Sequence, residues 1–155
     1  FAWEGEPPDP QAEETFHSAK IHPELRQNGD HAELFEFYRE LIRLRKLHAP
    51  LASLSRPDMR VEGDKAARVV WVSRQFQRQE CIAAFSFGES EVESRYPFDS
   101  AAFRKLIDTG NQSWSRTGLD GREIHLTHGT SLPMAPHAVI LLERIPPPPH
   151  EQRGA

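Results

Sequence analysis

Acidic side chains are the residues of this chain that could carry hydrolytic chemistry. Hydrolysis of a glycosidic bond needs two carboxylates with displaced pKa values on either side of a sugar-sized gap. The chain has 155 residues and 23 acids, but none of the acids stands in an apolar setting. Glu4, Glu6 and Asp9 cluster in a proline-rich stretch, which indicates a solvated loop or, as the alternative, a loop lining a site built elsewhere. We therefore assign no catalytic residue to this chain.

The histidines and the single cysteine do not form a recognised metal-binding or nucleophilic motif. His125 and His128 are three residues apart, and on a strand such residues point to opposite faces. Neither a cysteine nor a third histidine completes a zinc-type spacing, so we expect no metal site. Cys81 lies in the apolar run CIAAFSF and is expected to be buried and unreactive.

Three aromatic residues are candidates for binding a sugar substrate. Trp114 lies in the polar stretch GNQSWSRTG, where an exposed indole could stack on the C–H face of a sugar ring. The alternative, which we favour, is that Trp114 folds back over the edge of a β-structure and contributes little to sugar binding. Phe1 and Trp3 line a sugar cleft or pack beneath their own loop, and the sequence leaves both interpretations open. Trp71 lies in a strand-like run and is expected in the core.

The overall composition argues against two classes of partner. The net charge is −4 with mixed signs along the chain, so no basic stripe is present to neutralise the phosphates of a nucleic acid. No apolar run approaches the about 18 residues that a membrane span needs, and no signal peptide is evident. We therefore expect no membrane partner and a cytoplasmic location. The chain begins at Phe1 rather than at a methionine, which indicates a fragment.

One long amphipathic helix is predicted over residues 30–48. Asp30 is a suitable N-cap residue, and Pro50 stops the helix. Its apolar stripe is so wide that it needs a large apolar partner surface. The helix folds onto a face of the same chain, which we favour, or it self-associates with the same helix of a second chain. The residues expected in that contact are Leu34, Phe37, Leu41 and Ile42.

From about residue 56 the hydrophobic period changes to two, which is typical of strands. Gly63-Asp64 and Gly110-Asn111 are expected in turns. Because no second amphipathic helix is present, a βαβ repeat is excluded. The sequence therefore predicts a mainly β fold, an antiparallel β-sandwich over residues 51–145, and a proline-rich, disordered tail over 146–155. The expected strands cover residues 68–74, 80–87, 91–96, 103–108, 123–126, 130–132 and 137–145.

Several segments together resemble a known family of enzymes. The segments FAWEGEPPDPQAEETFHSAKI and HAELFEFYRELIRLRKLHAPL are similar to the end of the catalytic barrel in malto-oligosyltrehalose trehalohydrolases, which belong to the α-amylase superfamily, glycoside hydrolase family 13. Ser18–His22 departs from the family's S-K-L-D-like turn, which leaves a branching or debranching relative open. The matching stretches are Phe1–Trp3, Pro8–Gln11, Phe16–Lys20, Phe37–Arg45, Lys105–Gly118 and Leu132–Leu141.

The resemblance implies a division of the chain and a role for it. Residues 1–50 would be a loop and the last helix of a (β/α)8 barrel, and residues 51–145 an α-amylase-type carboxy-terminal sandwich. The catalytic carboxylates would precede Phe1, so the parent protein would be the enzyme and this fragment alone would not. The parent would hydrolyse the α-1,4 bond that releases trehalose from maltooligosyl trehalose, without a cofactor. Its barrel and its α-glucan substrate would be the partners of this region.

Two other classes of function stay open on the sequence alone. One is a free-standing carbohydrate-binding sandwich, and the other is a sandwich used only for interaction with another protein. Neither of them needs a long amphipathic helix preceded by a proline-rich segment, whereas the end of a barrel does. The helix therefore favours the enzyme-associated hypothesis.

Overall fold

The computed structural model describes residues 9–53, 55–110 and 121–146. The chain divides into two compact units, residues 1–35 and residues 36–155, and each is described by itself. No helix in the described part of the chain is both long and apolar enough to cross a lipid bilayer.

The first unit is helical in its described part, which starts at residue 9. It contains helix α1 (Glu13–Ser18), the short 3-10 helix η1 (Pro23–Gln27) and the first residues of helix α2 (Gly29–Leu47). No residue between 9 and 35 is buried, and Phe16 and Ile21 are largely exposed. This stretch therefore has no apolar core of its own.

Helix α2 confirms the predicted long helix, with each end displaced by one residue. It begins at Gly29, so Asp30 lies in the first turn, where a negative charge interacts favourably with the helix dipole, rather than at the N-cap. It ends at Leu47, and His48 precedes the short helix α3 (Ala49–Ala52). Pro50 sits in the first turn of α3, where its missing N–H group leaves no helical hydrogen bond unmade.

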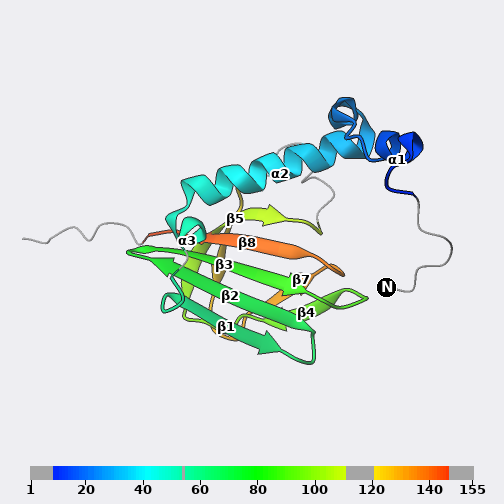
Figure 1. Cartoon of the computed structure of the whole chain (residues 1–155). Helices are drawn as coiled ribbons and strands as arrows, with labels where there is room; N and C mark the ends of the chain where they lie inside the picture. The colour runs from blue at the N-terminus through cyan, green and yellow to red at the C-terminus, as the bar shows by residue number, and fades with distance from the viewer. Residues whose placement is uncertain (1–8, 54, 111–120, 147–155) are drawn as a thin grey trace, which may run out of the picture. The chain divides into compact units, whose positions relative to one another are not determined.

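The second unit is mainly antiparallel β-structure, as the sequence predicted (Figure 1). Six strands form one sheet in the order β1-β2-β3-β8-β5-β6, and β4 pairs with β7 in a second, two-stranded sheet. Each pairing is antiparallel. The strands are β1 (Met59–Asp64), β2 (Val69–Phe76), β3 (Gln79–Ser86), β4 (Val92–Arg95), β5 (Ala101–Asp108), β6 (Glu123–Leu126), β7 (Ser131–Met134) and β8 (Val139–Arg144).

Strand β1 is the strand that the sequence did not predict. Gly63-Asp64 was expected as a turn, but both residues pair with β2, opposite Val70 and Val69. Five of the six residues of β1 are exposed, so the strand carries no alternation of buried and exposed side chains. Backbone hydrogen bonds to β2, rather than side-chain burial, therefore hold it at the edge of the sheet.

The inner face of the six-stranded sheet packs against the β4–β7 pair through the main hydrophobic core. Trp71, Phe103 and Leu142 from the large sheet are almost fully buried there, as is Met134 from β7. The indole N–H group of Trp71 donates a hydrogen bond of 2.9 Å to the hydroxyl of Ser94 in β4. The prediction that Trp71 lies in the core is confirmed.

The outer face of the same sheet carries the second half of α2 and the short helix α3. A smaller core joins buried Leu44 of α2 to Ile107 of β5 and Leu141 of β8. His48, after α2, and Glu143 of β8 lie 2.8 Å apart (Nδ1 to Oε1). The second half of the helix thus packs on the sheet of its own chain.

Candidate functional site

The three sequence-predicted sugar-binding residues, Phe1, Trp3 and Trp114, lie outside the described residues, as do Glu4 and Glu6. Their role stays a prediction. The site must therefore be sought among the acids, the histidines and the hollows of the described part of the chain.

Glu80 is the one acid of the described residues that is buried. Its carboxylate accepts hydrogen bonds from Ser73 (2.6 Å), Gln75 (3.2 Å) and Arg144 (3.0 Å). Burial raises the pKa of Glu80, but these hydrogen bonds and the positive charge of Arg144 outweigh it, so the pKa lies below its ordinary value. A carboxylate held ionised in this way is a structural anchor and not a proton donor.

Sequence reasoning did not single out Glu80, although a signal was present. In a strand, residues two apart share a face, so Glu80 shares its face with Ile82 and Ala84, both of which are buried. The alternation thus places a charge at a core position. Its partners Arg60, Ser73 and Arg144 come from three other strands, and only the folded sheet brings them together.

A polar hollow of about 610 Å³ lies beside the β1–β2 hairpin and next to Trp71. Asp64 lines it and accepts hydrogen bonds from the backbone N–H group of Ala67 and from the hydroxyl of Ser94. The bond from Ala67 is the largest of the effects that lower the pKa of Asp64 below its ordinary value. Glu62 is the second carboxylate of this hollow. A lowered pKa favours the charged form of Asp64, which is the opposite of what the proton donor in glycosidic hydrolysis requires.

The two histidines considered for metal binding do not come together with further ligands in the described residues. His125 lies in β6 and is exposed, and His128 lies beyond the end of that strand. Within the ranges that the structure describes, no three residues of the metal-binding types are grouped closely enough to hold an ion.

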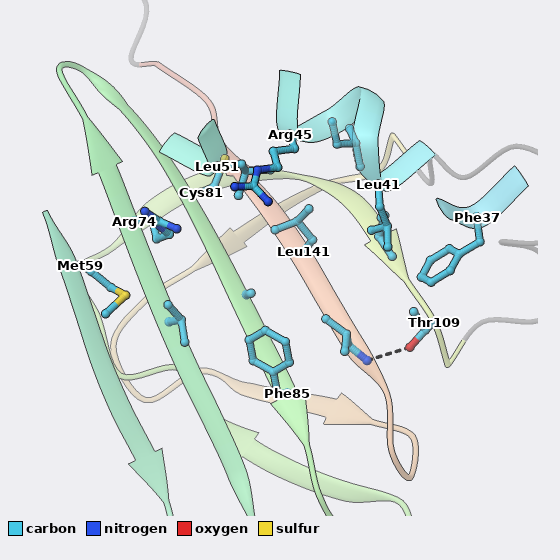
Figure 2. A pocket seen from close by; sticks show the side chains of 15 residues that line it. Phe37, Leu41, Arg45, Leu51, Met59, Arg74, Cys81, Phe85, Thr109 and Leu141 are labelled. Carbon is cyan, nitrogen blue, oxygen red and sulfur yellow. Dashed lines mark hydrogen bonds between the residues drawn. The ribbon is translucent and has the colours of Figure 1, made fainter. Parts of the chain in front are cut away.

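An apolar groove of about 630 Å³ lies on the outer face of the six-stranded sheet, beside α2 (Figure 2). Helix α2 forms one wall, α3 contributes Leu51, and strands β1, β2, β3, β8 and β5 form the floor. Cys81 lines the groove and is 2% exposed, which confirms its predicted burial. Burial raises the pKa of Cys81 to about 12, so the thiol is protonated at neutral pH.

Two arginines mark one end of this groove. Figure 2 shows the side chains of Arg45 and Arg74 at the end where Leu51 and Cys81 lie, away from Phe85 and Thr109. Arg74 donates a hydrogen bond to the backbone carbonyl of Ser53. In the described part of the chain, neither Arg45 nor Arg74 forms an ion pair with a carboxylate. The groove is thus apolar along its length and positively charged at one end.

Comparisons with known proteins relate part of this chain to glycoside hydrolases. No protein-family model matches the chain. It is 32% identical over 94 residues to the malto-oligosyltrehalose trehalohydrolase of Deinococcus radiodurans, 48% over 61 residues to that of a Rhizobium species, and 47% over 47 residues to that of Brevibacterium helvolum. These matches cover 59%, 39% and 30% of the chain but only 15%, 10% and 8% of the three relatives.

Among solved structures, a similar one overlaps with part of the chain. It is a GH30 endoxylanase from Clostridium papyrosolvens, with a TM-score of 0.43 and 14% identity. The overlap covers 60% of this chain and 25% of that structure.

Proposed function

We propose that this chain is the non-catalytic carboxy-terminal portion of a glycoside hydrolase that releases trehalose from maltooligosyl trehalose by hydrolysis of an α-1,4 bond. The observation that carries the proposal is the likeness to three proteins of that name, which reaches 48% identity over 61 residues. Each of these relatives is several times longer than the matched stretch. The catalytic carboxylates would then lie in the part of the polypeptide that precedes Phe1.

Two acids of the described residues, Glu80 and Asp64, support a non-catalytic role. A retaining or inverting glycosidase needs one carboxyl group with a raised pKa to protonate the leaving oxygen. The pKa of Glu80 and that of Asp64 are both shifted downward by hydrogen bonds, which is the opposite direction. Both side chains stabilise the sheet in their charged form.

The exposed side of α2 supports a barrel as the partner of this region. Phe37, Leu41 and Leu44 face the sheet, whereas Tyr38 and Ile42 on the same helix are 58% and 54% exposed. An amphipathic helix that buries one flank and leaves further apolar side chains in water has surface available for a second partner. We assign that partner to the wall of the catalytic barrel, with α2 as its last helix and the strands after it as an α-amylase-type sandwich. The proposed division is 1–50, 51–145 and 146–155.

Trehalose release by the longer polypeptide and by the 155-residue chain tests the proposal. With maltooligosyl trehalose as substrate, the longer polypeptide is expected to release trehalose and the 155-residue chain none. Trehalose release by the short chain that is lost on one carboxylate substitution would show that the chain itself is catalytic. Starch and pullulan serve as control substrates: a longer polypeptide that cleaves only these would contradict the trehalose specificity and leave the carboxy-terminal role in place.

A further inference from the structure

The outer face of the six-stranded sheet is wider than the helix that covers it. Neighbouring strands lie about 4.8 Å apart, so six strands span about 24 Å, while a helix with its side chains is about 10 Å wide. Leu44 of α2 clusters with Ile107 and Leu141, on strands β5 and β8, and Ala83 on β3 packs against this cluster. Helix α3 covers part of β2 and β3 at one end of the groove. The remaining floor over β1, β2 and β3 has room for a second helix of the same width.

The side chains on that floor are suited to a packed helix rather than to water. Met59, Val72 and Phe85 line the groove from three consecutive strands and remain partly or largely exposed. Met59 and Val72 lie on β1 and β2, so the apolar surface reaches the edge of the sheet beyond α2. Where helices cover one face of an antiparallel sheet, neighbouring helices pack about 8–10 Å apart.

We propose that this groove is the seat of a second amphipathic helix, which belongs to a part of the same polypeptide outside residues 1–155 and packs alongside α2. The proposal rests on the proposed function, under which the chain is a small part of a longer protein. The three relatives provide most of their length outside the matched stretch, so chain is available to supply the helix. The residues of β3 that line the groove run from Cys81 to Phe85, so this part of the floor is about 16 Å long and accommodates a helix of about three turns.

Charge complementarity defines one end of the occupant. The guanidinium groups of Arg45 and Arg74 flank the groove where α3 closes it, and neither is paired with a carboxylate of the described residues. Arg45 is exposed and Arg74 is partly buried. Arginines so placed favour a carboxylate that they can contact through two N–H groups. The occupant therefore carries Asp or Glu on its last turn at this end, next to an apolar stripe that faces Val72 and Phe85.

Thiol footprinting compares the groove in the short and in the long polypeptide. Phe85→Cys places a thiol inside the groove, and Phe87→Cys, two residues further along the chain and largely exposed, places one outside it. The labelling rate of each thiol is followed peptide by peptide with mass spectrometry. In the longer polypeptide, the thiol at position 85 is expected to react at least about tenfold more slowly than in the 155-residue chain, while the rate at position 87 stays within about twofold. Equal rates at position 85 in both polypeptides would overturn the proposal.

A benzophenone side chain at position 85 identifies the occupant. Photolysis of the longer polypeptide is expected to join it to an apolar, helix-patterned peptide that contains an acidic residue and lies outside residues 1–155. A cross-link within residues 1–155, to the same or to a second copy, would overturn the proposal in favour of self-association. So would attachment to a small apolar molecule.

The charge at the groove end has its own control. Arg45→Glu in the longer polypeptide is expected to accelerate labelling at position 85, whereas Arg104→Glu on β5, which lies outside the groove, is not. An equal effect of both substitutions would contradict the proposed acidic residue of the second helix next to Arg45 and Arg74. Trehalose release by the same variants is measured separately, so a failure of the groove proposal is distinct from a failure of the proposed function.

Discussion

On the inner face of the six-stranded sheet, Phe103 is 0% exposed, whereas on the outer face Phe85 lines an open groove. The inner phenylalanine packs edge-on against Tyr96, with ring centroids 5.8 Å apart. The outer one faces a space that α2 only partly fills. The two faces therefore differ in how far this chain covers them. The residues of the chain cover the inner face, whereas the outer face has room for further protein.

The polar side chains on the two faces of the sheet also differ in whether they have partners. On the inner face, the carboxylate of Glu80 and the indole of Trp71 have hydrogen-bond partners at 2.6–3.0 Å. At the groove on the outer face, Arg45 and Arg74 have no carboxylate partner among the described residues. The satisfied groups at Glu80 and Trp71 therefore stabilise the inner face, whereas the arginines on the outer face are available to an interface.

Truncating a phenylalanine on each face gives the largest contrast. Phe103→Ala is expected to lower the free energy of unfolding by about 3–5 kcal/mol, because it opens a cavity in a closed core. Phe85→Ala is expected to cost about 1 kcal/mol or less, since the side chain already contacts solvent. Urea unfolding of the 155-residue chain, followed by circular dichroism, measures both. Equal losses would mean that the two faces are equally closed and that no groove exists in solution.

A charge on either flank of α2 tests which side of the helix the sheet uses. Leu41→Asp is expected to lower the free energy of unfolding by about 2–4 kcal/mol, because Leu41 packs on the smaller core. Ile42→Asp, on the exposed flank, is the matched control and is expected to change it by about 0.5 kcal/mol or less. Thermal unfolding and sedimentation are measured together. If Leu41→Asp leaves the melting temperature unchanged and abolishes a dimer, self-association through α2 is the better account.

How far the sequence predicted the molecule also differs between the two faces. The inward-facing alternation of β2, β3 and β8 placed these strands to within about two residues, because burial on one face leaves a strong period of two. Strand β1 was missed, since an edge strand with exposed side chains carries no such signal. The helix was predicted from its apolar stripe, but the stripe could not show which flank meets the sheet.

The candidate sites depended still more on long-range contacts. The anchor at Glu80 joins residues from four strands, and the groove arises only when residue 37 lies near residue 139. No local pattern encodes such distances. Cys81 was placed correctly because its burial follows from the strand alone, whereas its position in the groove does not.

The anchor at Glu80 gives the inner face a dependence on pH. Because the folded-state pKa of Glu80 lies below 4.5, its contribution to stability is present above that pH and is lost as the pH falls through the folded-state value. Glu80→Gln is expected to lower the free energy of unfolding at pH 7 by about 1.5–3 kcal/mol and to flatten its decline below about pH 4.5. The exposed Glu123→Gln is the control. Urea midpoints between pH 3 and pH 7 measure both, and an unchanged acid profile would show that Glu80 is not the anchor.

The smallest expected effect concerns two buried serines on the inner face, which share their burial and differ in their partners. The hydroxyl of Ser73 donates to Glu80, whereas the hydroxyl of Ser86 has no hydrogen-bond partner in the described part of the chain. A buried hydroxyl without a partner costs about 1–3 kcal/mol, and a bond to a carboxylate contributes about as much. Ser73→Ala is therefore expected to lower the free energy of unfolding by about 1–2 kcal/mol, and Ser86→Ala to leave it unchanged or raise it by up to about 1 kcal/mol. Urea midpoints of the two variants, measured side by side at pH 7, decide the matter. If Ser86→Ala destabilises the chain as much as Ser73→Ala does, then Ser86 has a partner in solution, and the inner face is satisfied at this position as well.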